Sequence, residues 1–274
     1  DRCAVAVIMP DGTVELLSGN QIGVLLCDFI AQNLRSNGRL PQNAAVISTI
    51  VSTLMIKKVC ADNNIKYFEV LTGFKYIGEM IAEFEKTGDY TFLLGFEESF
   101  GYLKGTYARD KDSVVAAMLI TQMAMFYKNK HMNLKQAMDE LYKKYGWFAE
   151  KTVSFSISGA QPMEQVGRIM KSLRDSNDSD VAGTDIICLR DYKLRQIRNF
   201  CTGEITQTTL PVSDVLYYEL DNGCSVVVRP SGTEPKIKFY FGVKASLESV
   251  AGFERVQAEL DAKIEAIKKD LKLE

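Results

Sequence analysis

The spacing of apolar residues divides the first half of the chain into two kinds of segment. Short apolar runs at residues 44–50, 67–71 and 90–94 predict buried strands. The intervening segments repeat apolar residues every three or four positions, which predicts helices at residues 53–60, 76–85 and 113–127. The same spacing predicts a helix opening at Ser18–Asn20 and another at 133–145, which ends at Gly146. Alternating strands and helices are typical of βαβ units, so we expect a parallel sheet with helices on both faces, an α/β/α domain.

The second half has a different pattern. Residues 152–157 alternate between apolar and polar with period two, which predicts a half-buried strand. A helix is predicted at 162–173, further strands at 186–189, 217–220, 225–228 and 237–243, and a closing amphipathic helix at about 247–271. Asp221–Gly223 indicates a hairpin turn. We therefore expect a smaller α+β domain with a mostly antiparallel sheet.

The first residues stand apart from both halves. Residues 3–9 and 13–17 predict two strands joined by a turn at Pro10–Gly12. The chain begins with Asp1-Arg2 rather than Met and enters this hairpin at once, which indicates a fragment of a longer protein. The expected division is a hairpin at 1–18, an α/β/α domain at 19–146 and an α+β domain at 147–274.

Composition narrows the classes of protein. A length of 274 residues corresponds to about two domains. A net charge of −2 argues against a broad nucleic-acid surface, and no apolar run is long enough to cross a membrane. With one histidine and six cysteines, none of them paired as Cys-x-x-Cys, a zinc site is not expected. The scattered cysteines suit a reducing compartment, so we expect a cytoplasmic protein.

The segment Arg229–Lys236, with sequence RPSGTEPK, lies between two predicted strands. A guanidinium matches the oxygens of a phosphate, hydroxyls donate to the same oxygens, and glycine lets the backbone come close. Arg229, Ser231, Gly232 and Thr233 are therefore candidate phosphate ligands. An ordinary turn fits the same composition equally well, since Pro, Ser and Gly all favour turns.

The segment Gly95–Gly101 follows the predicted strand at 90–94. Ligands of α/β sheets bind at the carboxyl ends of the strands. Glu97 and Ser99 are therefore candidates for holding sugar hydroxyls. The competing interpretation is the start of a helix, with acidic residues in its first turn.

Two further loops precede predicted helices. Arg109 and Lys111 are poorly placed for helix stability, because cations oppose the dipole at a helix N-terminus, and an anionic ligand would resolve this. The alternative is pairing with Asp110, Asp112 or nearby acids. Thr72 and Gly73 offer a hydroxyl and backbone N–H groups to a polar ligand.

Taken together and in this order, these loops resemble the α-D-phosphohexomutase superfamily, in its bacterial phosphoglucomutase/phosphomannomutase branch. The resemblance covers essentially the whole chain. Its members have four domains, which carry in turn a phosphorylated serine, a magnesium loop, a sugar-reading loop and a phosphate-binding loop. The chain resembles the third and fourth domains, preceded by the last hairpin of the second. It departs from many relatives at Ser48, where they carry lysine.

The resemblance assigns roles to residues of this chain. Glu97 and Ser99 match the pair that holds the sugar, with Thr72, Gly73, Arg109 and Lys111 as further substrate contacts. Arg229, Ser231, Gly232 and Thr233 match the phosphate loop. Asp1 matches the end of the magnesium loop, whose other ligands are absent, so Mg²⁺ is expected in the parent protein and is not expected to bind well to this chain.

The resemblance also implies a reaction. The parent interconverts hexose 1-phosphate and 6-phosphate through a phosphoserine and a bisphosphate intermediate. The expected partners are hexose phosphates, hexose bisphosphates and the missing N-terminal domains. Since this chain lacks the serine, we expect no catalytic residue in it and no activity of the chain alone. Alternatives are a phosphopentomutase, a sugar-bisphosphate synthase or a non-catalytic sugar-phosphate-binding module.

Overall fold

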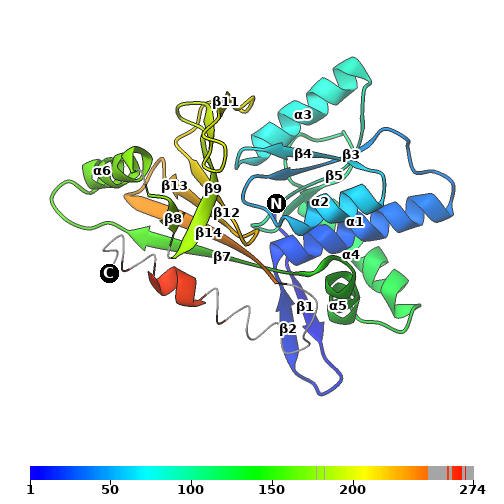
Figure 1. Ribbon diagram of the computed structural model, residues 1–274. Coiled ribbons are helices and arrows are strands. Elements are labelled where there is room, and N and C mark those ends of the chain that lie inside the picture. The colour runs from blue at the N-terminus through cyan, green and yellow to red at the C-terminus, as the bar shows by residue number, and fades with distance from the viewer. Residues whose placement is uncertain (177, 182, 246–257, 259–260, 267–268, 270–274) are drawn as a thin grey trace. The chain divides into compact units, whose positions relative to one another are not determined.

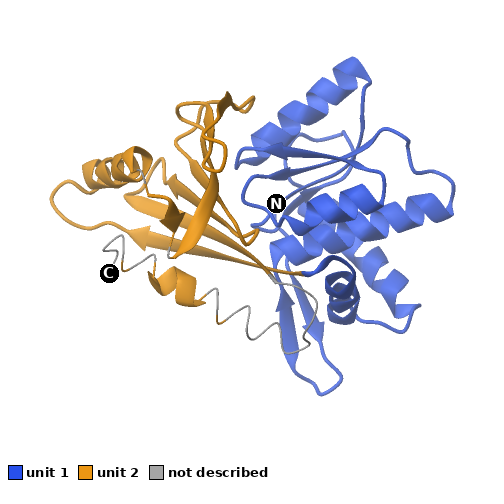
Figure 2. Cartoon of the chain, viewed as in Figure 1, with its two compact units in different colours: residues 1–146 blue, residues 147–274 orange. Residues whose placement is uncertain are grey.

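The computed structural model describes residues 1–176, 178–181, 183–245, 258, 261–266 and 269 (Figure 1). The chain divides into two compact units, Asp1–Gly146 and Trp147–Glu274 (Figure 2). Each unit is described below by itself.

Unit 1 contains a hairpin followed by alternating strands and helices. Its elements are β1 (Val5–Ile8), β2 (Val14–Leu17), α1 (Gly19–Ser36), β3 (Ala44–Thr49), α2 (Met55–Asp62), β4 (Lys66–Val70), α3 (Phe74–Thr87), β5 (Thr91–Glu97), β6 (Gly101–Leu103), α4 (Ser113–Lys128) and α5 (Leu134–Tyr145).

The main sheet of unit 1 has the order β4-β3-β5-β6. Strands β4, β3 and β5 run parallel, and β6 is antiparallel to β5. All six side chains of β3 are buried, as expected for a strand covered on both faces. Figure 1 shows α3 on one side of the sheet and α1 on the other. The predicted α/β/α class is confirmed.

Local signals explain where the helices begin. Ser18 caps α1: its hydroxyl accepts from the Gln21 N–H, and the Gln21 side chain accepts from the Ser18 N–H, which forms a capping box. Asn133 and Gln136 form a second capping box at α5. Both starts agree with the sequence-based boundaries within one residue.

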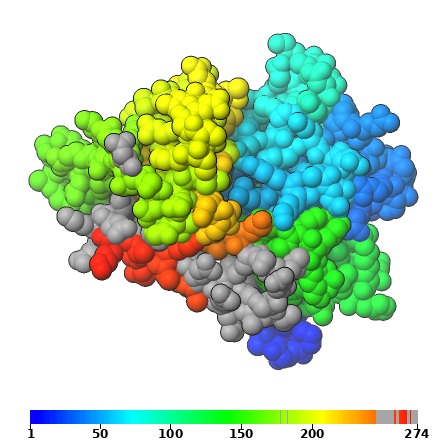
Figure 3. All heavy atoms as spheres, viewed as in Figure 1, coloured from blue at the N-terminus to red at the C-terminus, as the bar shows by residue number. Residues whose placement is uncertain are grey.

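The hairpin of β1 and β2 is a separate two-stranded sheet. Ile8 and Leu16 on it are 74% and 78% exposed. Figure 3 shows its dark blue tip protruding from the surface. The assignment of residues 1–18 to a preceding domain stays a prediction.

Unit 2 is built around an antiparallel sheet. Its elements are β7 (Trp147–Ser156), α6 (Pro162–Asp175), β8 (Asp180–Val181), β9 (Thr184–Asp191), β10 (Gln196–Asn199), β11 (Ile205–Gln207), β12 (Leu216–Leu220), β13 (Ser225–Pro230) and β14 (Lys236–Ala245). The strand order is β11-β10-β9-β12-β13-β14-β7, with β8 paired to β9. Alternate residues of β13 and β14, such as Val228 and Phe239, enter a core with Val166 and Met170 of α6. The predicted α+β character of the second half is confirmed.

Four short strands were not predicted: β6, β8, β10 and β11. Most of the predicted closing helix at 247–271 lies outside the described residues. Within it, residues 261–266 are helical, and Ile264 is buried in the unit 2 core. None of the helices among the described residues has the length and apolar character needed to span a bilayer.

Candidate functional site

Glu97 is the last residue of β5 and lies at the carboxyl edge of the unit 1 sheet. Its side chain is 5% exposed, and its Oε1 accepts a hydrogen bond from the Gly73 N–H at 3.0 Å. Burial raises the pKa of this carboxyl, while Lys111 and the Gly73 bond act in the opposite direction. The segment turns directly into β6, so the alternative of a helix start is wrong. A carboxylate held this way can accept hydrogen bonds from ligand hydroxyls.

Lys111 lies close to Glu97. Its aliphatic chain covers Gly101, where an added Cβ would be 2.8 Å from Lys111 Cδ and 3.4 Å from Glu97 Oε2. The Lys111 ammonium pairs with Asp110 at 2.9 Å and with Asp1 at 3.2 Å. Its side chain is only 14% exposed. The structure therefore places the Lys111 side chain beside the buried carboxylate of Glu97. The pairing of Lys111 with Asp110, which was one of the two interpretations of the sequence, is also present.

Ser99 lies in the turn between β5 and β6. Its carbonyl accepts a hydrogen bond from the Arg2 guanidinium at 2.8 Å, which ties the first residues of the chain to this turn. The half-buried hydroxyl of Ser99 forms no hydrogen bond with the described residues. It is free to bind a polar ligand.

Thr72 and Gly73 join β4 to α3 beside Glu97. The Thr72 hydroxyl is buried and has no hydrogen-bond partner in the described part of the chain. Buried polar atoms are normally paired, so this hydroxyl at the edge of the sheet is suited to pair with a polar ligand. Gly73 has φ of +127°, a conformation that residues with a side chain rarely adopt. This conformation turns its N–H towards Glu97.

Arg109 does not join this group. Its guanidinium pairs with Glu85 of α3 and donates to the carbonyls of Thr106 and Ala108. An acid near Arg109 therefore pairs with it, as the alternative interpretation expected. That acid is Glu85 rather than Asp110 or Asp112. The role of Arg109 as a substrate contact stays a prediction.

A second polar cluster at the same sheet edge was missed from the sequence. It lies where β3 ends: Thr49 Oγ1 is 3.0 Å from Ser52 Oγ and 3.5 Å from Glu98 Oε2, and the Thr53 N–H donates to Asn20 at 3.1 Å. Asn20, Thr49 and Thr53 are all less than 5% exposed. The available signal was the pair Ser52-Thr53, which follows closely on an apolar strand, because ligands of α/β sheets bind at the carboxyl ends of strands.

In unit 2, the segment from Arg229 to Lys236 reverses the chain between β13 and β14. The Ser231 N–H donates to the Lys236 carbonyl at 2.8 Å, and the Glu234 N–H donates to Ser231 Oγ at 3.3 Å. Strand β13 continues through Pro230, so Arg229 lies on the strand rather than in the loop. Gly232 and Thr233 are exposed at the tip.

Arg229 and Lys238 are direct partners in the register of β13 and β14. Like charges opposite one another destabilise a sheet unless an anion lies between them. The Arg229 guanidinium has no hydrogen bond or ion pair with the described residues, so it is available to an anion. Lys236 is engaged with Glu234 at 2.9 Å, and this contact lowers the pKa of the Glu234 carboxyl.

No group of three or more His, Cys, Asp or Glu side chains suited to a metal ion occurs in the described ranges. Asp1, the predicted remnant of a metal loop, pairs with Lys111 instead.

An α/β/α unit followed by a mostly antiparallel unit is the arrangement of the last two domains of phosphohexomutases. Two family models match this chain. Phosphoglucomutase/phosphomannomutase alpha/beta/alpha domain III matches residues 18–145, and the C-terminal domain of the same family matches residues 191–269. The chain therefore belongs to the phosphoglucomutase/phosphomannomutase family, and the resemblance found from its sequence is confirmed.

Individual relatives agree with this assignment. The phosphoglucomutase of Staphylococcus saprophyticus is 31% identical over 244 residues, which are 89% of this chain and 44% of the relative. A phosphoglucomutase of Staphylococcus aureus is 32% identical over 245 residues, which are 89% of this chain and 43% of the relative. The chain thus spans less than half the length of these relatives.

Solved structures share the fold. Parafusin, a phosphoglucomutase from Paramecium, aligns with a TM-score of 0.60 at 15% identity, over 94% of this chain and 42% of its own. A phosphoglucomutase/phosphomannomutase family protein from Burkholderia thailandensis aligns with a TM-score of 0.52 at 16% identity. The alignment covers 98% of this chain and 45% of the Burkholderia chain.

Proposed function

We propose that this chain is the substrate-recognising part of a phosphohexomutase. Glu97 and Ser99, with Thr72, Gly73 and Lys111 beside them, hold the hydroxyls of a hexose. The observation that carries the proposal is the buried Glu97 carboxylate, fixed by the Gly73 N–H and flanked by the orphan hydroxyl of Thr72. These groups accept and donate hydrogen bonds in an arrangement that suits a polyol.

We propose that the phosphate group of such a hexose phosphate binds at the segment Arg229–Lys236, between β13 and β14 of unit 2. Arg229 supplies a charged fork, Ser231 and Thr233 supply hydroxyls, and Gly232 leaves the backbone open, since nothing lies within 4 Å of an added Cβ. An N-acetylphosphoglucosamine mutase from Aspergillus fumigatus, which shares this fold with a TM-score of 0.52, is described in complex with glucose 1,6-bisphosphate. We infer that this chain takes hexose phosphates and bisphosphates.

In the whole protein, the reaction interconverts hexose 1-phosphate and 6-phosphate through a phosphoserine outside this chain. The residues of this chain position the substrate: binding of a remote phosphate is used to orient the reacting group. The sugar-reading residues face hydroxyls in either orientation of the bisphosphate, so the same residues serve both half-reactions. The protein is proposed to act in the cytoplasm.

A turnover assay tests this assignment. The 274-residue chain is mixed with glucose 1-phosphate, glucose 1,6-bisphosphate and Mg²⁺, and glucose 6-phosphate is measured. We expect no conversion, with binding of the sugar phosphate retained. Conversion by the chain alone would contradict the assignment, and the same assay on mannose and ribose phosphates with the whole protein determines the preferred sugar.

A further inference from the structure

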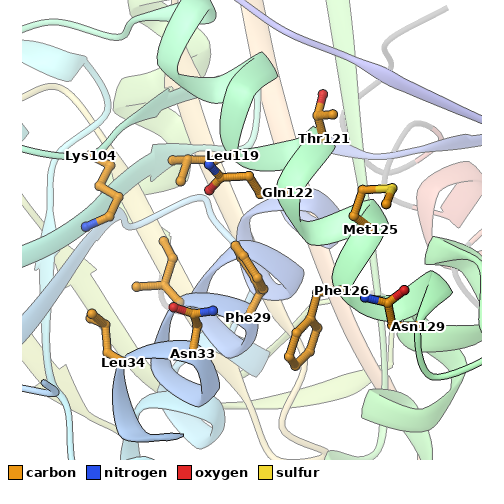
Figure 4. Close-up of a pocket in the computed structure, with 11 residues that line it drawn as sticks. Phe29, Asn33, Leu34, Lys104, Leu119, Thr121, Gln122, Met125, Phe126 and Asn129 are labelled. Atoms are coloured by element: carbon orange, nitrogen blue, oxygen red, sulfur yellow. The ribbon is translucent and has the colours of Figure 1, made fainter. Parts of the chain in front are cut away.

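Unit 1 contains a cavity that none of the candidate sugar-binding residues lines. It has a volume of about 590 Å³ and is lined mainly by α1 and α4 (Figure 4). Lys104, which follows β6 directly, contributes the one charged side chain among the described residues that line it. None of the proposed sugar-binding or phosphate-binding residues lines this cavity.

Lys104 has no counter-ion among the described residues. Its side chain is half-buried and has no hydrogen bond or ion pair with the part of the chain that the structure describes. Burial lowers the pKa of its ammonium, and no acid opposes this effect. Figure 4 shows the side chain extending towards Asn33 and Leu34 of α1. A half-buried cation without a partner has lost part of its hydration, and an anion in the cavity would compensate for that loss.

The rest of the lining is apolar with a few amides. Phe29 and Phe126 meet edge to face, with ring centroids 5.3 Å apart, and Leu119 adds an aliphatic wall. Asn33 and Gln122 extend amide groups around the same opening (Figure 4). A site with aromatic walls, three side-chain amides (those of Asn33, Gln122 and Asn129) and one cation fits a ligand with an apolar body and one negative charge.

We propose that this cavity is a binding site for a small organic monocarboxylate with an aromatic or aliphatic body. The carboxylate pairs with Lys104, and the apolar body packs against the wall formed by Phe29, Phe126 and Leu119. The volume falls within the range of about 300–1,000 Å³ that is typical of small-molecule sites. This site is separate from hexose-phosphate binding and does not depend on the proposed function.

Ligand-observed ¹⁹F NMR tests the proposal with the whole chain. The probes are 4-fluorobenzoate and 6-fluoro-2-naphthoate, each compared with its neutral amide. We expect saturable binding of at least one carboxylate, about tenfold tighter than its amide, because the charged hydrogen bond is lost in the amide. Lys104→Met should abolish this difference while leaving amide binding unchanged. Lys86→Met, at an exposed lysine of α3, is the matched control and should bind as the wild type does.

Three results would overturn the proposal. One is no saturable binding of either carboxylate, and another is unchanged carboxylate affinity in Lys104→Met. The third is displacement of the probe by excess glucose 1-phosphate, which would assign the probe to the hexose-phosphate residues. Circular dichroism of Lys104→Met checks that the variant is folded, and we expect it to be, since methionine fills the same space without a buried charge.

Discussion

Glu97 is a buried carboxyl that we propose binds sugar hydroxyls, and its burial should make the stability of the chain depend on pH. Burial raises the pKa of its carboxyl above the ordinary value of 4.5, so the folded chain holds this proton at a higher pH than the unfolded chain. The free energy of unfolding contributed by Glu97 therefore falls as pH rises through that window. The contribution of Asp110 to the free energy of unfolding rises with pH instead, because its hydrogen bonds from Lys111 lower the pKa of its carboxyl.

Glu97→Gln should remove this dependence. Relative to the wild type, the variant should gain free energy of unfolding as pH rises from about 4.5 towards neutrality, because it has no charge to bury. Urea denaturation at a series of pH values measures the difference. Asp110→Asn is the contrast: it should lose stability relative to the wild type as pH rises towards 3.8 from below, and the deficit should stay constant at higher pH. A Glu97→Gln difference that is constant with pH would contradict the role of burial.

Arg229 should dominate binding of a simple anion. Arg229→Ala removes a charged hydrogen-bond donor, so affinity for inorganic phosphate should fall by about 1.5–3 kcal/mol, roughly ten- to a hundredfold. Isothermal titration calorimetry measures this loss. Arg168→Ala removes an exposed arginine from α6 and is the matched control, for which we expect wild-type affinity. Equal affinities in both variants would show that the bend is an ordinary turn.

At the scale of whole elements, α3 packs closely on the segment that carries Arg109 and Lys111. A Cβ added at Gly78 would lie 2.5 Å from the Arg109 carbonyl oxygen, which is too close for two atoms in contact. Since a backbone atom cannot move aside as a side chain does, α3 and this segment would separate. The small residue therefore sets the position of the segment relative to the sheet edge.

Gly78→Ala should lower the free energy of unfolding by about 1–3 kcal/mol, the usual effect of overpacking. Gly167→Ala on α6 is the control: nothing lies within 4 Å of its added Cβ, so helix propensity should raise stability by about 0.5–1 kcal/mol. Chemical denaturation of both variants measures these changes. A Gly78→Ala variant as stable as Gly167→Ala would contradict the close contact.

The elements themselves were largely predictable because each carries a local signal. Apolar periodicity and capping residues such as Ser18 indicated α1 and its neighbours, and the family motif indicated the bend at Arg229. Strand β6 was missed because three residues, Gly101–Leu103, are too few for a periodic pattern. Strands β10 and β11 were missed because their residues are mostly polar and partly exposed.

Side-chain partners were less predictable than elements. Arg109 pairs with Glu85, 24 positions away, and the long side chain gives no sequence signal of its direction. The contact between Thr49 and Glu98 spans 49 positions and forms only because β3 and β5 are neighbours in the sheet. Such contacts depend on the tertiary fold, whereas elements depend on nearby residues.

At the scale of the whole molecule, each unit has its own core. Ile77 and Phe84 of α3 pack on Ile47 of β3 in unit 1, while unit 2 buries Val166 and Met170 of α6 against its sheet. Within unit 2, Arg174 of α6 pairs with Asp191 at 2.7 Å and with Asp214 at 2.6 Å. The candidate sugar-binding residues and the candidate phosphate-binding residues therefore belong to separately built units.

We propose that the two units bind different parts of one class of ligand, a hexose that carries phosphate. The most direct measurement is calorimetric titration of glucose 1,6-bisphosphate into the chain, Glu97→Gln and Arg229→Ala. We predict that each variant binds the bisphosphate about tenfold more weakly or worse, while Glu97→Gln retains the affinity for inorganic phosphate. Unchanged bisphosphate affinity in both variants would contradict the account.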